Sequence, residues 1–199
     1  NEFIESYFPL RIERYETIPD SGGAGLHRGG NGLSVAYRFL CDGDIGIHDD
    51  RWLTYPWGVL GGETGLRSTK KLVRADGSEE WLAAKVEGIK VKTGDVLYFN
   101  TWGGGGWCDP FARDPELVRQ DVARRLVSIE GSKRYGVVMA SDGTVDQAGT
   151  DKLRATLIAA RGDNSALFNF GGELEDIRSR CEAETNLPAP VKPTFVGAK

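Results

Sequence analysis

The chain has 199 residues, of which 40% are hydrophobic and 27% charged, a composition typical of folded protein with a substantial core. Its 29 acidic and 25 basic residues are interspersed and leave a net charge of -4, which excludes a basic strip that a nucleic acid could follow. Because no apolar run approaches the roughly 20 residues that cross a bilayer and no signal-peptide pattern is present, we expect a cytoplasmic protein without a membrane partner.

The first half of the sequence predicts short antiparallel strands. Residues 7–17 alternate apolar and charged side chains, as in a half-buried strand, and a second strand-like run covers residues 33–40. A hairpin is expected around Asp76-Gly77, the dipeptide that best supports a tight turn, and two further strands are linked through residues 93–95. Strands at this spacing are typical of a barrel or a sandwich.

The hydrophobic period becomes helical after residue 107. Asp114 is a good N-cap and Pro115 suits the first helical position, so we predict a helix over residues 115–126. Ser128 can cap a short helical turn, and the β-branched run at 135–141 indicates one more strand.

Two more helices are expected near the end of the sequence. Asp146 caps the first, which carries Leu153, Leu157 and Ile158 on one face and ends near Gly162. The second covers residues 173–184.

These elements predict an α+β fold, with a β-rich N-terminal half of short antiparallel strands and glycine-rich loops followed by a helical C-terminal part. We expect a β-rich region at 1–110, a mainly helical region at 111–187 and a proline-rich, extended tail at 188–199. The only methionine is Met139, and the first residues already have the pattern of a domain interior, so we expect a piece of a longer polypeptide.

Glycine is the most unusual feature of the composition. The 27 glycines are about twice the average usage and are clustered, most densely in two loops, residues 20–32 (DSGGAGLHRGGNG) and 101–110 (TWGGGGWCDP). Backbone N–H groups of such loops can converge on a phosphate, but neither loop has a P-loop ending or a dinucleotide-binding pattern. We favour a structural reading, in which the four glycines let the chain reverse at a strand end while Trp102 and Trp107 fix the flanks by burial.

Other residues that could carry chemistry each have a simpler structural interpretation. His48 and Asp50 would share one side of a strand, as metal ligands do, but a surface hydrogen bond is favoured. Cys108 beside Asp109 is expected to be an inert thiol, and the odd number of separated cysteines, Cys41, Cys108 and Cys181, indicates reduced thiols. Arg28 could grip a carboxylate or phosphate, although an ion pair with Asp20 or another nearby acid is favoured.

Four motifs in register resemble the C-terminal part of the hydantoinase B/oxoprolinase family, whose members include N-methylhydantoinase, 5-oxoprolinase, caprolactamase, and acetone and acetophenone carboxylases. The motifs are ESYFPLRIERYETIPDSGGAGLHRGGNGL at 5–33, PWGVLGGETG at 56–65, the run from GD to WCDPFARDPELVRQDV at 94–122, and YGVV at 135–138. The resemblance implies that the chain is roughly the last third of a longer subunit.

The resemblance also implies a division of labour. In this family a hydantoinase A-type subunit or domain binds and hydrolyses ATP. The B-type part acts on the phosphorylated intermediate and in several members carries a metal. The expected partners are therefore the rest of the B-type subunit, an A-type ATP-binding subunit and a small-molecule substrate. ATP and magnesium are expected in the A-type partner, and any divalent metal in the missing N-terminal part, so no cofactor is expected on this segment.

The implied function is a segment of an ATP-dependent cyclic-amide hydrolase, with a segment of a ketone carboxylase or a non-catalytic scaffold as the alternatives. Cys108 departs from the family, which usually has glycine there, and we expect a negative φ at this position. No catalytic residue and no metal ligand is assigned. The candidate substrate or interface residues are Asp20, Ser21, Gly22, Gly23, Gly25, Arg28, Gly29, Gly30, Trp102, Gly103, Gly104, Gly105, Gly106, Trp107 and Asp109.

Overall fold

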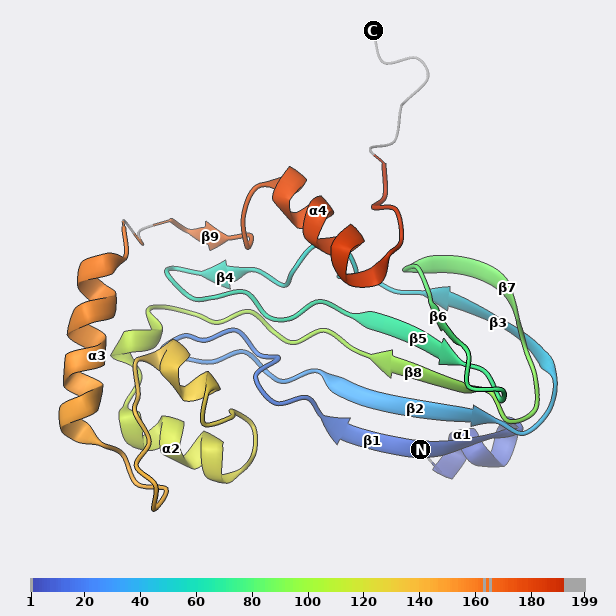
Figure 1. Cartoon of the computed structure of the whole chain (residues 1–199), viewed down its shortest axis with the longest axis horizontal. Coiled ribbons are helices and arrows are strands. Elements are labelled where there is room, and N and C mark those ends of the chain that lie inside the picture. Colours follow the sequence, from blue (N-terminus) through green and yellow to red (C-terminus); the bar gives the residue numbers. More distant parts are fainter. Residues whose placement is uncertain (1, 163, 165, 192–199) are drawn as a thin grey trace, which may run out of the picture.

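The structure is a computed structural model that describes residues 2–162, 164 and 166–191 (Figure 1). Its helices are α1 (Glu2–Tyr7), α2 (Pro115–Ala123), α3 (Gln147–Ala160) and α4 (Leu174–Thr185), with 3-10 turns η1 (Pro110–Ala112) and η2 (Gly131–Tyr135). Its strands are β1 (Leu10–Thr17), β2 (Leu33–Phe39), β3 (Gly43–His48), β4 (Gly58–Val59), β5 (Thr69–Val73), β6 (Glu79–Trp81), β7 (Lys85–Val91), β8 (Val96–Asn100) and β9 (Phe168–Asn169). None of the helices in the described part of the chain has the length and apolar character needed to span a bilayer.

The predicted α+β class is confirmed, with antiparallel strands in the first half and helices in the second (Figure 1). The main sheet has five antiparallel strands in the order β1-β2-β8-β5-β6, and β3 pairs with β7 in a separate two-stranded sheet. β7 and β8 follow each other through the turn at 93–95 but lie in different sheets. The two sheets meet in one hydrophobic core, to which they contribute Phe39, Ile47, Leu72, Ile89, Val91 and Leu97.

The hairpin expected at Asp76-Gly77 joins β5 to β6, and Gly77 has the left-handed conformation that this turn requires (φ 87°). The strand predicted over residues 7–17 begins only at Leu10, because the preceding residues form helix α1. Sequence periodicity also missed the short pairing of β4 with β9, which brings residues 58 and 169 together.

The chain does not reverse at the tetraglycine, contrary to our expectation. β8 leads into residues 101–106 in the same direction, and these residues run extended towards the helical end of the molecule (Figure 1). None of the four glycines has a positive φ. Residues 101–108 lie between two other glycine-rich segments, 21–30 and 56–66, and we call these three segments the glycine layer.

Helix α2 begins where the sequence predicted, with Pro115 at its first position and the Asp114 side chain accepting a hydrogen bond of 2.8 Å from the backbone N–H of Glu116. It ends at Ala123 and not at 126, because the chain leaves the helical conformation at Arg125 (φ 59°). The Ser128 hydroxyl accepts from the N–H of Gly131 at the start of η2, 2.8 Å away.

The strand expected at 135–141 is wrong, since this run makes only an isolated bridge between Met139 and Val145. Its residues instead join a second core, in which Val118, Tyr135 and Val137 pack with Ala24 of the glycine layer.

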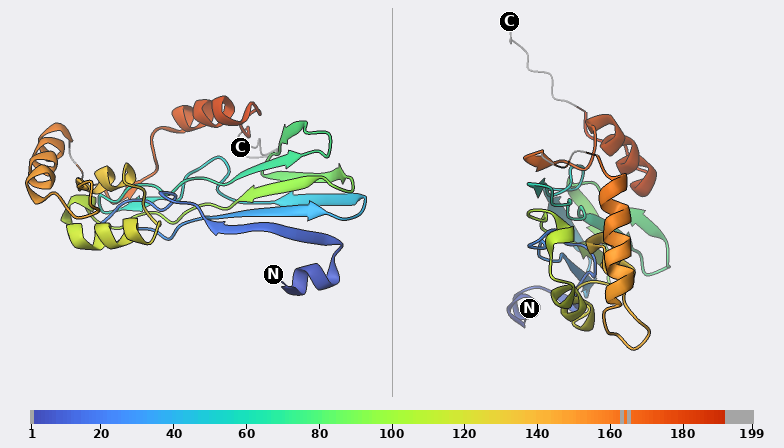
Figure 2. Two further views of the ribbon diagram at one scale, coloured as in Figure 1. Left: turned by 60° about the horizontal axis from the view of Figure 1, so that its bottom comes forward. Right: turned by 90° about the vertical axis from the view of Figure 1, so that its left-hand side faces the viewer.

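The last two predicted helices are present as α3 and α4. The Asp146 side chain caps α3 by accepting from the N–H of Gly149, 2.9 Å away. α4 lies above the strands, apart from α3 (Figure 2), and buries Ile177, Cys181 and Thr185. Of the proline-rich tail expected at 188–199, residues 192–199 lie outside the described residues.

Candidate functional site

The glycine layer is held together by backbone hydrogen bonds. Gly104 donates to the carbonyl of Gly30 (2.8 Å) and accepts from the N–H of Gly23 (2.8 Å) on one side of the tetraglycine. On the other side, Gly106 donates to Glu63 (2.8 Å) and accepts from Val59 (2.9 Å). Gly103 and Gly29 also donate to backbone carbonyls. Because these N–H groups already have partners, the layer does not hold them free for a phosphate.

Close approach of main chain to main chain explains why glycine is required here. A Cβ added at Gly105 would lie 1.6 Å from the carbonyl oxygen of Trp57, and one at Gly106 would lie 2.0 Å from that of Ala24. Among the candidate glycines predicted from the sequence, those at which a Cβ would come within 3.0 Å of neighbouring backbone are Gly22, Gly23, Gly25, Gly29, Gly103, Gly105 and Gly106. Gly104 is less crowded, with its nearest contact at 3.1 Å, and Gly30 has no atom within 4 Å.

The expectation that Trp102 and Trp107 are buried is wrong. The two residues are 41% and 45% exposed, although Trp107 contacts the ring of His27 with a centroid distance of 5.2 Å. Main-chain pairing, and not tryptophan burial, therefore fixes the tetraglycine: Trp107 and His27 exchange two backbone hydrogen bonds of 2.9 and 3.1 Å. The two indoles remain available on the surface.

Asp20 and Ser21 fix the start of the glycine layer by hydrogen bonds. The Asp20 carboxylate accepts from the N–H of Ser128 (2.9 Å), and the residue itself has a positive φ of 62°. The buried Ser21 hydroxyl donates to the carbonyl of Ile18 (2.6 Å) and accepts from the N–H of Gly32 (2.8 Å), which closes the loop.

Arg28 forms the ion pair that the sequence favoured, but its partner is Asp121 on α2 and not Asp20. The Arg28 Nε lies 3.3 Å from one carboxylate oxygen of Asp121, and Arg113 lies 2.9 Å from the other. Arg113 also donates to the carbonyl of Leu26, 2.8 Å away. Since the Asp121 side chain is only 7% exposed, this network attaches α2 to the glycine layer and leaves Arg28 with a partner.

Asp109 is also engaged within the protein. Arg161, the residue after α3, donates to both of its carboxylate oxygens at 2.8 and 2.6 Å, and the N–H of Phe111 donates at 2.9 Å. The hydrogen bonds from Arg161 hold the pKa of Asp109 below its usual value.

Cys108 keeps the backbone shape that glycine would take. Its φ is 59°, so the expectation of a negative φ at this position is wrong. Its N–H donates to Val59 (2.9 Å) and its carbonyl accepts from Leu26 (3.2 Å), and these bonds hold the residue in a conformation that disfavours a side chain.

His48 contacts the carboxylate of Glu87 on β7, and Asp50 lies 3.9 Å from Lys85. Both are exposed surface pairs, but the expected pairing of His48 with Asp50 is wrong, because each contacts another residue and β3 ends at His48. Among residues 2–162, 164 and 166–191, no three His, Cys, Asp or Glu side chains are grouped so that they could hold a metal.

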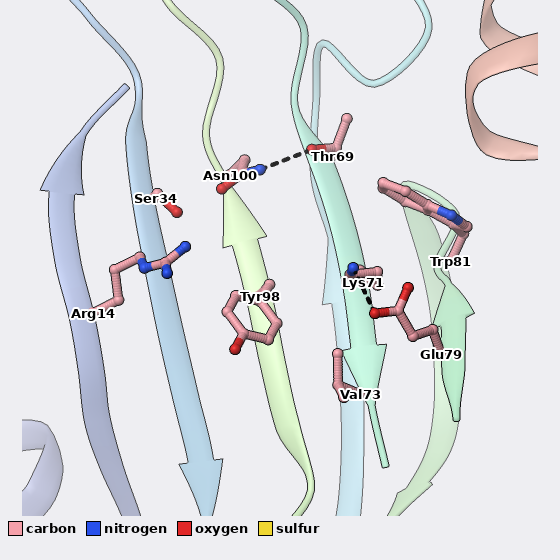
Figure 3. Close-up of a pocket in the computed structure, with 9 residues that line it drawn as sticks. All are labelled: Arg14, Ser34, Thr69, Lys71, Val73, Glu79, Trp81, Tyr98 and Asn100. Atoms are coloured by element: carbon pink, nitrogen blue, oxygen red, sulfur yellow. Dashed lines mark hydrogen bonds and ion pairs between the residues drawn. The ribbon is translucent and has the colours of Figure 1, made fainter. Parts of the chain in front are cut away.

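Sequence reasoning missed a groove on the main sheet. It has a volume of about 360 Å³ and crosses the strands where β8 meets the glycine layer (Figure 3). Its floor and walls are formed by Arg14, Ser34, Thr69, Lys71, Val73, Glu79, Trp81, Tyr98 and Asn100. Alternation along each strand puts these side chains on one face, but finding them together required the strand order.

A buried ionic cluster was missed as well. The Nζ of Lys70 and the hydroxyl of Ser68 both donate to the carboxylate of Asp49, and all three side chains are almost fully buried. Burial lowers the pKa of Lys70. The cluster lies under the main sheet, where the ring of Phe99 is 5.4 Å from the Lys70 Nζ, and so it belongs to the core and not to an open site.

The family model and similar curated proteins indicate the same family. The model of the hydantoinase B/oxoprolinase family matches residues 1–110. The beta subunit of the caprolactamase of Pseudomonas jessenii is 34% identical over 161 residues, which are 77% of this chain and 27% of that protein. The B-type subunit of a putative D-/L-hydantoinase of Pseudomonas sp. is 30% identical over 155 residues, 77% of this chain and 26% of that protein.

Two solved structures share the fold. The ATP-dependent caprolactamase of Pseudomonas jessenii superposes with a TM-score of 0.63 at 29% identity and covers 77% of this chain and 28% of its own. A nucleotide-free acetone carboxylase superposes with a TM-score of 0.65 at 20% identity, covering 81% of this chain and 27% of its own. The chain thus spans only about a quarter of the length of these proteins.

Proposed function

Because this chain belongs to the hydantoinase B/oxoprolinase family, we propose that it is a segment of the B-type subunit of an ATP-dependent cyclic-amide hydrolase. The observation that carries the proposal is the similarity to the beta subunit of caprolactamase, at 34% identity over 77% of the chain. The whole glycine layer lies within the residues that the family model matches.

In the proposed reaction, a partner A-type subunit transfers the terminal phosphoryl group of ATP to the amide oxygen of the substrate. The phosphorylated imidate is a far better electrophile than the amide, since its oxygen can leave as phosphate. Water adds to the ring carbon, and the protonated ring nitrogen leaves from the tetrahedral adduct, which breaks the carbon–nitrogen bond and gives an acyl phosphate. A second water then hydrolyses the acyl phosphate to the carboxylate and free phosphate. ATP and magnesium act in the partner, and we propose that any metal is held by other parts of the B-type subunit.

We propose that the glycine layer of this segment forms a rigid surface beside the substrate cavity or the partner subunit. The main-chain packing of the glycine layer leaves no room for adjustment, and Trp102 and Trp107 project from it as exposed aromatic surface. We propose that these two indoles contact the substrate cavity or the partner subunit. We do not assign this role to Arg28 and Asp109, because each is engaged in an internal ion pair.

The reaction is tested by assaying the full-length B-type subunit with its A-type partner. ADP formation and ring opening are followed with caprolactam, hydantoin and 5-oxoproline, and with acetophenone in the presence and absence of bicarbonate. Ring opening that requires ATP and both subunits is expected. Turnover of the ketone that requires bicarbonate, without lactam hydrolysis, would replace the proposal with the carboxylase alternative.

A second assay separates a cavity role from a scaffold role. Trp102→Ala and Trp107→Ala are compared with Ile129→Ala, a change at another exposed apolar residue (66% exposed). Turnover lost in an intact complex supports the cavity role, whereas loss of the complex in gel filtration supports the scaffold.

A further inference from the structure

The groove of Figure 3 has the features of a ligand site that the proposed reaction does not use. It lies on the face of the main sheet opposite the β3–β7 core, since its residues alternate along the strands with Leu72 and Leu97 of that core. We propose that it binds a small molecule that carries a carboxylate on a planar ring.

Charge favours an anion. Of the lining residues, Arg14 and Lys71 are positive and Glu79 is negative, which leaves one positive charge in excess. Lys71 pairs with Glu79 at 2.9 Å. The closest contact of Arg14 with Glu16 is from its Nε, at 3.3 Å, and both side chains are about half exposed or more (47% and 64%). Such a surface pair is weak, so Arg14 can turn the rest of its guanidinium to a ligand carboxylate.

Hydrogen-bond donors gather beside Arg14. The hydroxyls of Ser34 and Tyr98 lie on the floor of the groove, and Figure 3 draws no hydrogen bond from either to another lining residue. The Arg14 guanidinium lies 5.5 Å from the centre of the Tyr98 ring, which keeps these donors on one side of the groove. Guanidinium and hydroxyl groups are donors that suit a carboxylate, whereas a cation would meet the positive charge of Arg14.

The opposite wall favours a planar ring. Trp81 is 38% exposed, and the Lys71 Nζ lies 5.8 Å from the centre of the indole. A partly exposed indole offers aromatic contact to a flat ring and does not repel an anion held at the far side of the groove. A volume of about 360 Å³ suits a small molecule, at the lower end of the roughly 300–1,000 Å³ of ligand pockets.

The test is titration of the 199-residue chain with benzoate, followed by calorimetry and by the indole NMR signal of Trp81, which is assigned with Trp81→Phe. Benzamide has the same ring without the charge, and acetate has the charge without the ring. Saturable binding of benzoate is expected, with benzamide and acetate each about tenfold weaker.

Variants connect that binding to the groove. Arg14→Met is expected to weaken benzoate about tenfold, and Ser34→Ala or Tyr98→Phe severalfold. Arg11→Met is the matched control, because it removes the same charge from the same strand at a residue that does not line the groove. Circular dichroism confirms that each variant is folded.

The proposal is overturned if benzoate does not saturate, if benzamide binds equally well, or if Arg11→Met weakens binding as much as Arg14→Met. None of these measurements involves ATP or a partner, so they can fail while the proposed hydrolase function stands, and the reverse also holds.

Discussion

Arg161 holds the carboxylate of Asp109 by two hydrogen bonds, from Nη1 at 2.8 Å and from Nη2 at 2.6 Å, and its guanidinium also lies 4.9 Å from the centre of the Phe111 ring. Asp109 follows the glycine layer and Arg161 follows α3, so this pair joins the two halves of the chain. Both side chains are about one third exposed. The pair therefore attaches the end of α3 to the glycine layer, and neither side chain is free to act as a reactive group.

Asp109→Asn is expected to lower the free energy of unfolding by about 1 kcal/mol at neutral pH, because it removes a two-bond ion pair that is partly screened by solvent. The pKa of Asp109 is lowered in the folded protein from a usual value of 3.8, so its stabilisation is complete above that value and is lost as the pH falls through the lower folded pKa. Urea unfolding at a series of pH values measures the difference between wild type and variant, which should vanish in acid.

Asp44→Asn provides the control for this experiment. Asp44 pairs with Lys90 at 2.6 Å, but these side chains are 56% and 80% exposed. If Asp44→Asn lowers the free energy of unfolding as much as Asp109→Asn does, the two-bond geometry of the Arg161 pair does not add stability beyond that of an ordinary surface pair.

Gly105→Ala is expected to destabilise the protein by roughly 3 kcal/mol, because its Cβ would lie 1.6 Å from the Trp57 carbonyl oxygen and the backbone of the layer would have to move. Gly30→Ala is the matched variant in the same layer, with no atom within 4 Å of the added Cβ, and should change stability by less than about 1 kcal/mol. Denaturant midpoints compare the two, and equal midpoints would contradict the close packing described here.

Lys70→Met should cost about 3–5 kcal/mol, since it leaves the carboxylate of Asp49 buried without its cation. The double variant Asp49→Leu/Lys70→Met removes both charges and should recover much of that loss. Thermal and urea unfolding of the two single variants and the double variant measure the coupling. Additive effects would mean that the two buried groups act independently, against the geometry.

Cys108→Gly is expected to leave stability unchanged or to raise it by up to about 1 kcal/mol, because glycine adopts the observed φ of 59° without strain. Cys108→Val should destabilise, since a β-branched side chain disfavours that conformation most. The order of the unfolding midpoints, glycine at least equal to cysteine and both above valine, is the expected result, and the reverse order would exclude backbone strain at this residue.

The sequence predicted correctly those elements that depend on interactions between neighbouring residues. The Asp114-Pro115 start of α2, the Asp146 cap of α3 and the Asp76-Gly77 turn each depend on a few adjacent residues, and each is present. The end of α2 was misplaced because Arg125 adopts a left-handed conformation that its residue type does not favour.

The glycine layer and the groove could not be predicted because both depend on contacts between distant segments. The same four glycines are compatible with a reversal or with an extended run, and the carbonyls of Trp57 and Ala24 decide between them. Similarly, Arg14 and Trp81 lie 67 positions apart, and only the strand order β1-β2-β8-β5-β6 puts them on opposite sides of one groove.

The unbroken course of β8 into the tetraglycine has a mechanical consequence. From Val96 to Cys108 the chain forms a single extended segment of roughly 40 Å, at about 3.3 Å per residue. Its glycines are clamped by main chain on several sides, so it cannot buckle or shorten without breaking hydrogen bonds along its length. A displacement of the chain at Asn100 would therefore be transmitted along these residues to Trp107, which would couple the groove to the exposed indole.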